Sequence, residues 1–287
     1  MSDMRDMFQW KNEENEKLNI NHYGNVVYLS FPQLDRIPDI RHGFSTRLGG
    51  VSEGICASMN LSFTRGDREA DVFENYRRIS EAIGFSAESI VCSDQTHTAN
   101  VRTVTKQDCG YGITREKPYA DVDGLVTNEA GVTLATFYAD CVPLYLVDSV
   151  KKVIGLSHSG WKGTVGKIGK VTVETMVRDF GSNPEDICVA VGPSICQECY
   201  EVSEDVIEQF RAVFTEEQCG NMIIDKGNGK YQLDLWQACR YNFLAAGILP
   251  DHISLPNICT CCNPEVLFSH RASQGKRGNL AAFLCIT

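Results

Sequence analysis

The fold is decided by residues 121–163, which read DVDGLVTNEAGVTLATFYADCVPLYLVDSVKKVIGLSHSGWKG. This segment predicts a strand, a turn, a long apolar strand, a hairpin, another strand and a glycine-rich turn. Its apolar run 132–147 has 16 residues and is broken by Asp140 and Pro143. The run is therefore shorter than the roughly 20 apolar residues that a membrane-spanning helix needs. We predict a pair of buried strands instead.

Similar patterns extend outward from this segment. Strands are also predicted within 25–31, 89–104, 187–195, 266–273 and 279–286, and the glycine- and serine-rich stretch 40–62 is predicted to be a long loop. Helices are predicted over 67–83, 165–180, 203–214 and 234–246. No repeat, low-complexity tract or linker divides the chain. We therefore expect a loosely attached polar N-terminal arm over residues 1–20 and a single α/β domain over residues 21–287.

Composition limits the class of protein. The chain has 287 residues, 43% hydrophobic and 22% charged, which is typical of a soluble globular protein with a substantial core. Its net charge of −10 offers no basic face for nucleic acid, and no apolar stretch follows the N-terminus as a secretory signal would. Its 13 cysteines are odd in number, so they cannot all be paired within the chain. We expect a cytoplasmic protein, with neither nucleic acid nor membrane as a partner, whose thiols are buried, metal-bound or reactive.

Three polar segments interrupt the apolar pattern at strand ends: QTH at 95–97, ADC at 139–141 and SHSGWKG at 157–163. They carry His97, Cys141 and His158, and imidazole together with thiolate suits Zn²⁺ or copper. Three protein ligands would leave a fourth position open for water or substrate, as in catalytic zinc sites. The separations from 97 to 141 and from 141 to 158 match no local zinc motif. The alternative interpretation is therefore that Cys141 is a buried thiol and that the two histidines lie in turns and bond to the backbone.

Charged residues near these segments are further candidates. Asp140 lies inside an apolar run, where an ionisable group is costly unless it is paired. Asp123 begins a predicted strand and could be only a turn former. Arg47, Arg65 and Arg271 lie in glycine- or serine-rich segments, where a planar guanidinium could bind an anion. The alternative for each arginine is a solvated surface charge.

A second group of cysteines invites comparison with zinc ribbons. Cys196 and Cys199 form a C-x-x-C pair, and Cys259, Cys261 and Cys262 cluster near the C-terminus. The gap from Cys199 to Cys259 holds 59 residues, against roughly 15–20 in the usual spacing. No ribbon is therefore predicted. The chain also lacks a nucleophile elbow and a phosphate-binding P-loop.

Several segments together resemble one family. They are STRLGGVSEG (45–54), SMNLS (58–62), DQTH (94–97), YADCVPLYLVD (138–148), SHSGWKGTVGK (157–167), VGPSIC (191–196), YEV (200–202) and CTCCNPEVLFSHRAS (259–273). The chain resembles the laccase-domain proteins, formerly known as polyphenol oxidases and now described as zinc-dependent purine nucleoside phosphorylases. The resemblance implies a single-domain, four-layer α/β/β/α sandwich related to the catalytic domain of a bacterial cytotoxic necrotizing factor.

The resemblance also implies a metal site and an activity. Zinc, or alternatively copper, would be held by His97, Cys141 and His158. The family's activities are phosphorolysis of adenosine, inosine and methylthioadenosine to the free base and ribose-1-phosphate or its methylthio analogue, and hydrolytic deamination of adenosine. The expected partners are therefore purine nucleosides and phosphate, bound by a monomer or a homodimer.

Roles for other residues follow from the same resemblance. Arg271 matches the arginine of the family's F-S-x-R segment, which is implicated in activity, and Arg47 matches its TR-x-GG segment. Together with Lys162 and Asn60, these arginines are expected to bind substrate or phosphate. Catalysis would use His97, Cys141 and Arg271. As a hypothesis separate from the resemblance, Asp123 or Asp140 is the general acid or base, and no spacing argument chooses between them.

Two positions depart from the family pattern. The family usually has glycine after its first metal-binding histidine, where this chain has Thr98. The HxGW segment is more often followed by arginine, where this chain has Lys162, which keeps the charge but lacks the bidentate fork. Both departures bear on substrate preference more than on metal binding.

Two other functions stay open. A copper-dependent polyphenol oxidase could use the same metal site. A multicopper laccase, however, needs on the order of ten histidines, and this chain has 6, with His22 and His42 outside the proposed trio. A non-enzymatic thiol or metal sensor would rest on the cysteines at 196–199 and 259–262.

Overall fold

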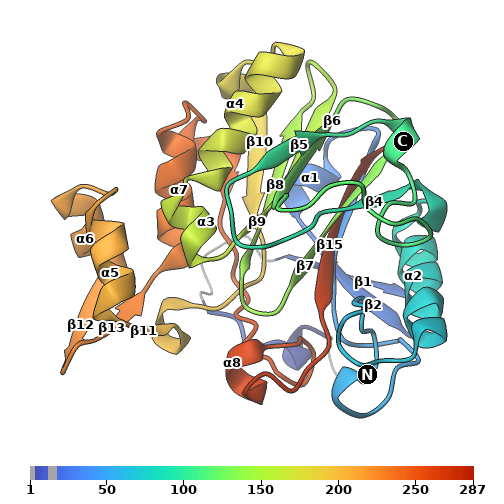
Figure 1. Ribbon diagram of the computed structural model, residues 1–287, viewed down its shortest axis with the longest axis horizontal. Helices are drawn as coiled ribbons and strands as arrows, with labels where there is room; N and C mark the ends of the chain where they lie inside the picture. The colour runs from blue at the N-terminus through green and yellow to red at the C-terminus, as the bar shows by residue number, and fades with distance from the viewer. Residues whose placement is uncertain (1–3, 12–17) are drawn as a thin grey trace.

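The computed structural model describes residues 4–11 and 18–287, in which two six-stranded sheets lie face to face (Figure 1). The strand order of the first sheet is β1 (Asn19–Tyr23), β2 (Val26–Ser30), β3 (Ile40–Ser45), β15 (Leu280–Ile286), β7 (Thr133–Tyr138) and β4 (Ile90–Cys92). That of the second is β14 (Ile253–Ser254), β10 (Ile187–Val191), β8 (Val142–Asp148), β9 (Val153–Ser159), β6 (Gly124–Thr127) and β5 (Val101–Thr103). A small third sheet has the order β11 (Glu201–Ser203), β13 (Lys230–Leu233) and β12 (Ile223–Gly227).

Helices cover the outer face of each large sheet, as Figure 1 shows. On the first sheet lies α2 (Glu69–Ile83), whose Tyr76 and Ile79 pack against Phe283 of β15. The second sheet is covered by α3 (Trp161–Val165), α4 (Ile168–Phe180) and α7 (Leu235–Leu244). The remaining α-helices are α1 (Pro32–Asp35), α5 (Glu204–Arg211), α6 (Glu216–Met222) and α8 (His270–Ser273). The order helix, sheet, sheet, helix confirms the predicted four-layer α/β/β/α domain.

Short 3-10 helices occupy several of the connections. They are η1 (Met4–Met7), η2 (Gly54–Cys56), η3 (Ala87–Ser89), η4 (Lys106–Asp108), η5 (Pro184–Asp186), η6 (Gln197–Cys199) and η7 (Pro250–His252).

Within the described residues, no helix combines the length and the apolar character that crossing a bilayer requires.

Burial on both faces explains why the central strands are almost continuously apolar. In β8, Tyr145 and Val147 point into the core between the sheets, whereas Leu144 and Leu146 point toward the helices. Side chains alternate between the two faces of a strand, so both faces need apolar residues when both are covered. The prediction of buried strands in this segment is confirmed.

The two strands of the run 132–147 do not pair with each other. β7 belongs to the first sheet and β8 to the second, and β8 pairs with β9 in an antiparallel hairpin. The chain crosses between the sheets at Asp140, which has a φ of 88°. The crossover therefore brings the ADC segment to the place where the two sheets meet.

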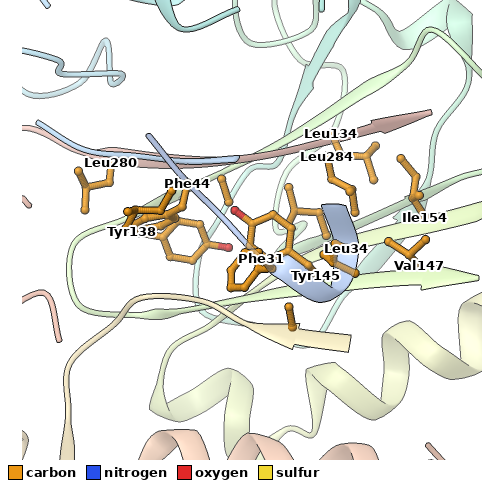
Figure 2. Close-up of a cluster of buried hydrophobic side chains, with 14 of the residues drawn as sticks. Phe31, Leu34, Phe44, Leu134, Tyr138, Tyr145, Val147, Ile154, Leu280 and Leu284 are labelled. Carbon is orange, nitrogen blue, oxygen red and sulfur yellow. The ribbon is translucent and has the colours of Figure 1, made fainter. Parts of the chain in front are cut away.

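Figure 2 shows the core between the sheets, where the rings of Tyr138 and Tyr145 lie side by side with Phe31 and Phe44. The Tyr145 hydroxyl donates a hydrogen bond to the carbonyl of Gly43 in the opposite sheet, at 2.9 Å. The Tyr138 hydroxyl likewise reaches the carbonyl of Ser157 at 3.1 Å. Both buried hydroxyls are thus satisfied, and each bond joins one sheet to the other.

Three expectations from the sequence are wrong. The stretch 40–62 is not a loop throughout, because its first residues form β3 between β2 and β15. No strand forms within 266–273, because the Ser269 hydroxyl accepts a hydrogen bond from the Ala272 amide and starts α8. The described part of the N-terminal arm is not loose: Phe8 is buried and Trp10 forms a β-bridge with Ile258.

Candidate metal centre and cavity

Three elements bring His97, Cys141 and His158 together. His158 lies in β9 opposite Pro143 of β8, so Cys141, two residues before Pro143, lies diagonally across the hairpin from it. His97 follows β4 of the first sheet, whereas His158 belongs to the second. The ligand atoms of these three residues all lie within 4.8 Å of one another, with 3.9 Å between Cys141 Sγ and His97 Nε2. The predicted trio therefore converges in space.

Asp123 holds two of these residues in place. Its Oδ1 contacts His158 Nδ1 at 2.8 Å and accepts a hydrogen bond from the His97 amide at 3.1 Å. Its Oδ2 accepts bonds from the amides of Thr96 and Thr98 and from the Thr98 hydroxyl, at 3.1, 2.9 and 2.9 Å. Because His158 Nδ1 is used in this way, its Nε2 is free to bind a metal, an arrangement typical of metal-ligating histidines.

The ionisation of the site matches this geometry. Burial opposes the charge on Asp123, but the hydrogen bonds from His158 and the backbone outweigh it and lower the pKa of Asp123 to about 2. Burial also opposes the Cys141 thiolate, but His158 and His97 outweigh it and lower the pKa of this thiol. A cysteine that ionises readily beside two imidazoles is a suitable donor for a borderline ion such as Zn²⁺. The residues present therefore fit the metal that the sequence predicted.

Gly160 makes this close approach feasible. A Cβ atom at this position would lie 2.7 Å from His97 Cδ2 and 3.2 Å from Cys141 Sγ. Both distances are shorter than ordinary van der Waals contacts, so any larger residue would push the two ligands apart. The glycine of the HSGW segment is thus required by packing.

A cavity of about 480 Å³ opens onto the three ligands. Its wall includes the aromatic side chains of Phe63, Tyr76, Phe137 and Tyr138. Polar groups on the wall include Asp94, Gln95 and Asn279, and cationic ones are Arg65, Lys117 and Arg277. The volume lies within the range of about 300–1,000 Å³ that small-molecule sites occupy.

Several predicted site residues do not line this cavity. Asp123 is fully buried behind the ligands, and Asp140 bonds to Thr260 Oγ1 and to the Arg271 amide, both at 2.7 Å. Arg271 directs its guanidinium to the carbonyls of Cys199 and Glu201, at 3.0 and 2.9 Å. These contacts favour positioning roles, and a direct catalytic part for Asp123, Asp140 or Arg271 stays a prediction.

The residues expected to bind phosphate are engaged elsewhere. Arg47 donates to the carbonyls of Ala57 and Pro264, at 2.9 and 2.8 Å, and its guanidinium lies over the Phe268 ring. Lys162 is exposed on α3, with its ammonium 5.6 Å from the centre of the Trp161 ring. Asn60 is buried, and its Oδ1 accepts a hydrogen bond from the amide of Asn279, at 2.9 Å. Asn60 therefore supports the cavity wall without reaching the cavity.

Sequence reasoning missed Arg277. It is only 8% exposed yet lines the cavity, and its Nε has no hydrogen-bond partner among the described residues. Burial and the nearby Arg65 lower the pKa of Arg277 to about 10. The glycines beside it in the segment QGKRGNL were the available signal, because the reasoning that singled out Arg47 and Arg271 in glycine- or serine-rich segments applies equally to this one.

Comparison with known proteins identifies the family of the chain. The model of the family described as multi-copper polyphenol oxidoreductase laccase matches residues 41–287. The chain belongs to this laccase family. It is 39% identical over 245 residues to the purine nucleoside phosphorylase YlmD of Bacillus subtilis, which covers 84% of this chain and 87% of that protein.

Two further relatives of this laccase-family chain are informative. The crystal structure of YlmD from Geobacillus stearothermophilus superposes with a TM-score of 0.85 at 36% identity, covering 93% of this chain and 98% of that one. A protein named adenosine deaminase RL5, from an unknown prokaryotic organism, is 34% identical over 231 residues, covering 79% of this chain and 87% of that protein. The expected family and its mixed α/β fold are both confirmed.

Proposed function

We propose that this protein is a metal-dependent enzyme of purine nucleosides. It would cleave adenosine, inosine and methylthioadenosine with phosphate and would deaminate adenosine with water. Relatives named as a purine nucleoside phosphorylase and an adenosine deaminase support this class of substrate. The observation that carries the proposal is the opening of the His97, Cys141 and His158 trio onto a cavity whose wall is partly aromatic and partly cationic.

The cavity suits a nucleoside in shape and chemistry. The faces of Phe63 and Phe137, both half-buried on its wall, can stack on a purine ring. The cavity also offers a binding place for an anion, because Arg65 and Arg277 lie on its wall. Arg277 Nε is buried without a partner among the described residues, and a buried polar atom of this kind is costly unless a ligand satisfies it.

We assign phosphate to these two arginines, in place of the pair Arg47 and Arg271 expected from the resemblance. In phosphorolysis, they would hold phosphate against the ribose carbon while the purine leaves. Holding the two reactants in line lowers the entropic part of the activation free energy. The guanidinium groups stabilise the phosphate anion without having to reorganise during the reaction. Asp94, the carboxylate on the cavity wall, is paired with Lys117 at 2.5 Å. It would exchange a proton with the purine base.

Zinc, held by His97, Cys141 and His158, would supply Lewis acidity when bound. The chain's part is to hold that donor set. Asp123 fixes the His158 ring so that Nε2 faces the cavity, and Gly160 leaves room for His97 beside Cys141. With three protein ligands, one coordination position is left for substrate or water.

Product analysis tests the proposal. Zinc-loaded protein is incubated with adenosine, with and without phosphate. Adenine and ribose-1-phosphate that form only with phosphate indicate phosphorolysis, and inosine indicates deamination. Cys141→Ala should lose zinc at this site together with both activities, whereas Cys188→Ala, a half-buried thiol in β10, should keep them. Absence of both products from fully zinc-loaded protein, or full turnover by Cys141→Ala, would contradict the proposal.

Copper oxidase chemistry at the same trio is the second hypothesis raised by the family's description. Two imidazoles and one thiolate form the ligand set at the cavity. A multicopper centre needs on the order of ten histidines, and the whole chain has 6. Metal analysis of protein purified without added copper, together with anaerobic adenosine assays, distinguishes the two hypotheses.

A further inference from the structure

Four cysteines outside the cavity converge as closely as the three cavity ligands do. They are Cys196 and Cys199, the N-cap and the last residue of η6, and Cys259 and Cys262, which precede α8. Their sulfur atoms all lie within 4.8 Å of one another. Cys199 Sγ is 3.5 Å and Cys196 Sγ 4.0 Å from Cys262 Sγ, and all four thiols are free.

These distances correspond to a metal tetrathiolate. At a Zn–S distance of about 2.3 Å, the sulfurs of a tetrahedral site lie about 3.8 Å apart. The sequence has two C-x-x-C pairs, 196–199 and 259–262, and each pair contributes two sulfurs. This is the composition of closed structural zinc sites, which have four protein ligands and no open position.

The surroundings are suited to thiolates. The amides of Cys196 and Cys262 donate hydrogen bonds to Cys259 Sγ, at 3.2 and 3.4 Å. Lys11 interacts electrostatically with Cys196 and Cys262 and pairs with Glu198 at 3.2 Å. Amide donors and a nearby cation stabilise the negative charge of a tetrathiolate in the way that outer groups support metal ligands elsewhere.

The long sequence gap hid this arrangement. The 59 residues between Cys199 and Cys259 hold the small sheet, α5, α6 and α7, and also β14, the edge strand of the second large sheet. The gap closes because Thr260 N donates to the Ser194 carbonyl at 3.1 Å, in a parallel β-bridge between Ser194 and Cys259. A spacing rule for compact ribbons does not apply when a folded insertion separates the two pairs.

We propose that Cys196, Cys199, Cys259 and Cys262 bind a structural zinc ion, separate from the metal at His97, Cys141 and His158. The inference does not depend on the proposed enzymatic function. The site would fasten the segment after β10 to the segment before α8. Two hydrogen bonds connect this region with other predicted site residues. The Arg271 guanidinium donates to the carbonyl of Cys199, and the Thr260 hydroxyl donates to Asp140, which is next to Cys141.

Metal counting with two sets of variants tests the inference. Protein is produced with zinc, purified under reducing conditions, and its zinc per chain is measured by elemental analysis. We expect two zinc ions in the wild type, one in Cys141→Ala, and one in the double variant Cys199→Ser with Cys262→Ser. The matched control is Cys261→Ser, whose thiol lies in the same segment but outside the group of four, and it should keep both ions.

Cobalt provides a readout that does not require the cluster to be mutated. The Cys141→Ala protein retains all four cluster thiols, and Co²⁺ bound to them should give thiolate-to-cobalt charge-transfer absorption with tetrahedral d–d bands. The inference is overturned if this variant binds no zinc and gives no such absorption. It is equally overturned if an alkylating agent modifies all four cluster thiols of the zinc-supplemented wild type without delay, or if these cysteines are isolated as two disulfides under the reducing conditions.

Discussion

Replacing Asp123 by Asn should perturb the proposed metal centre at the cavity without changing any of its three candidate ligands. Asp123 is fully buried and accepts five hydrogen bonds, two on Oδ1 from His97 N and His158 Nδ1, and three on Oδ2. An asparagine has one carbonyl oxygen and one NH2 group. If the asparagine oxygen keeps the three bonds of Oδ2, its NH2 group faces the His97 amide and His158 Nδ1. An NH2 group cannot accept a hydrogen bond from either donor.

The magnitude follows from the lost bonds. A hydrogen bond to a charged group contributes about 1.5–3 kcal/mol, and a buried donor left without an acceptor costs about 1–3 kcal/mol. Losing two bonds of this kind should lower the free energy of unfolding of the metal-free protein by about 3–5 kcal/mol. The His158 ring would also be free to adopt the tautomer that protonates Nε2, so zinc affinity should fall about 10–100-fold.

Urea unfolding of the metal-free protein and chelator competition for zinc measure these two effects. Asp121→Asn is the matched control, because Asp121 is exposed in the same segment and bonds to the Thr96 hydroxyl at 2.7 Å. It should change the free energy of unfolding by no more than about 0.5 kcal/mol. If Asp123→Asn unfolds at the same urea concentration as the wild type and binds zinc equally well, the positioning role assigned to Asp123 is wrong.

Three further changes test other parts of the structure. Arg277→Gln should raise the KM for phosphate about tenfold or more, since one charge-assisted hydrogen bond is worth about 1.5–3 kcal/mol; Arg77→Gln on the exposed face of α2 is the control in the same steady-state assay. Gly160→Ala should weaken zinc binding in chelator competition and lower the free energy of unfolding by about 1–3 kcal/mol through overpacking; unchanged binding would refute the packing argument. Burial lowers the pKa of His42 to about 4, against the opposing effect of Asp35, so the unfolded chain takes up a proton near pH 6.5 that the folded chain resists. Stability should therefore fall from pH 6.5 to pH 4 by up to about 3 kcal/mol, and His42→Gln should flatten that dependence in urea titrations.

The strands on either side of Asp140 could be predicted because their pattern has a single explanation. The apolar residues of β7 and β8, buried on both faces, indicate two strands with a break between them at Asp140. The same reasoning placed His97, Cys141 and His158 at strand ends. What the sequence could not provide was the crossover itself, which puts β7 and β8 in different sheets.

β3 was missed for a local reason. Its residues IRHGFS include an arginine, a histidine and a glycine, which are unusual in a central strand. In the fold, His42 Nε2 accepts a hydrogen bond from the Phe31 amide at 2.9 Å, so the histidine is buried and satisfied. A Cβ atom on Gly43 would lie 2.8 Å from Ile83 and 3.0 Å from Tyr28, so glycine is needed where α2 crosses the strand. Neither contact is visible in the sequence, because its partners lie far apart in the chain.

The two aspartates of the predicted catalytic set illustrate a general limit. An acidic residue in an apolar segment is conspicuous in a sequence whether it reacts with substrate or supports a neighbour. Asp140 has a φ of 88°, and that backbone conformation is held by Thr260 and by the Arg271 amide, both of which bond its carboxylate. Both carboxylate oxygens of Asp140 are therefore used in contacts within the fold, and Asp140 does not line the cavity.

Acid–base chemistry in the cavity is therefore better assigned to groups that face it. Among the described residues that line the cavity, Asp94 is the carboxylate, and Lys117 lies beside it at 2.5 Å. Asp94→Asn should lower kcat for deamination by about 10²–10⁴-fold, the usual contribution of a general acid or base, while zinc content stays at the wild-type level. The isosteric change leaves the Lys117 contact with the Ser93 carbonyl, at 2.9 Å, in place. If zinc-loaded Asp94→Asn deaminates adenosine at the wild-type rate, the proton must be carried by a group other than Asp94.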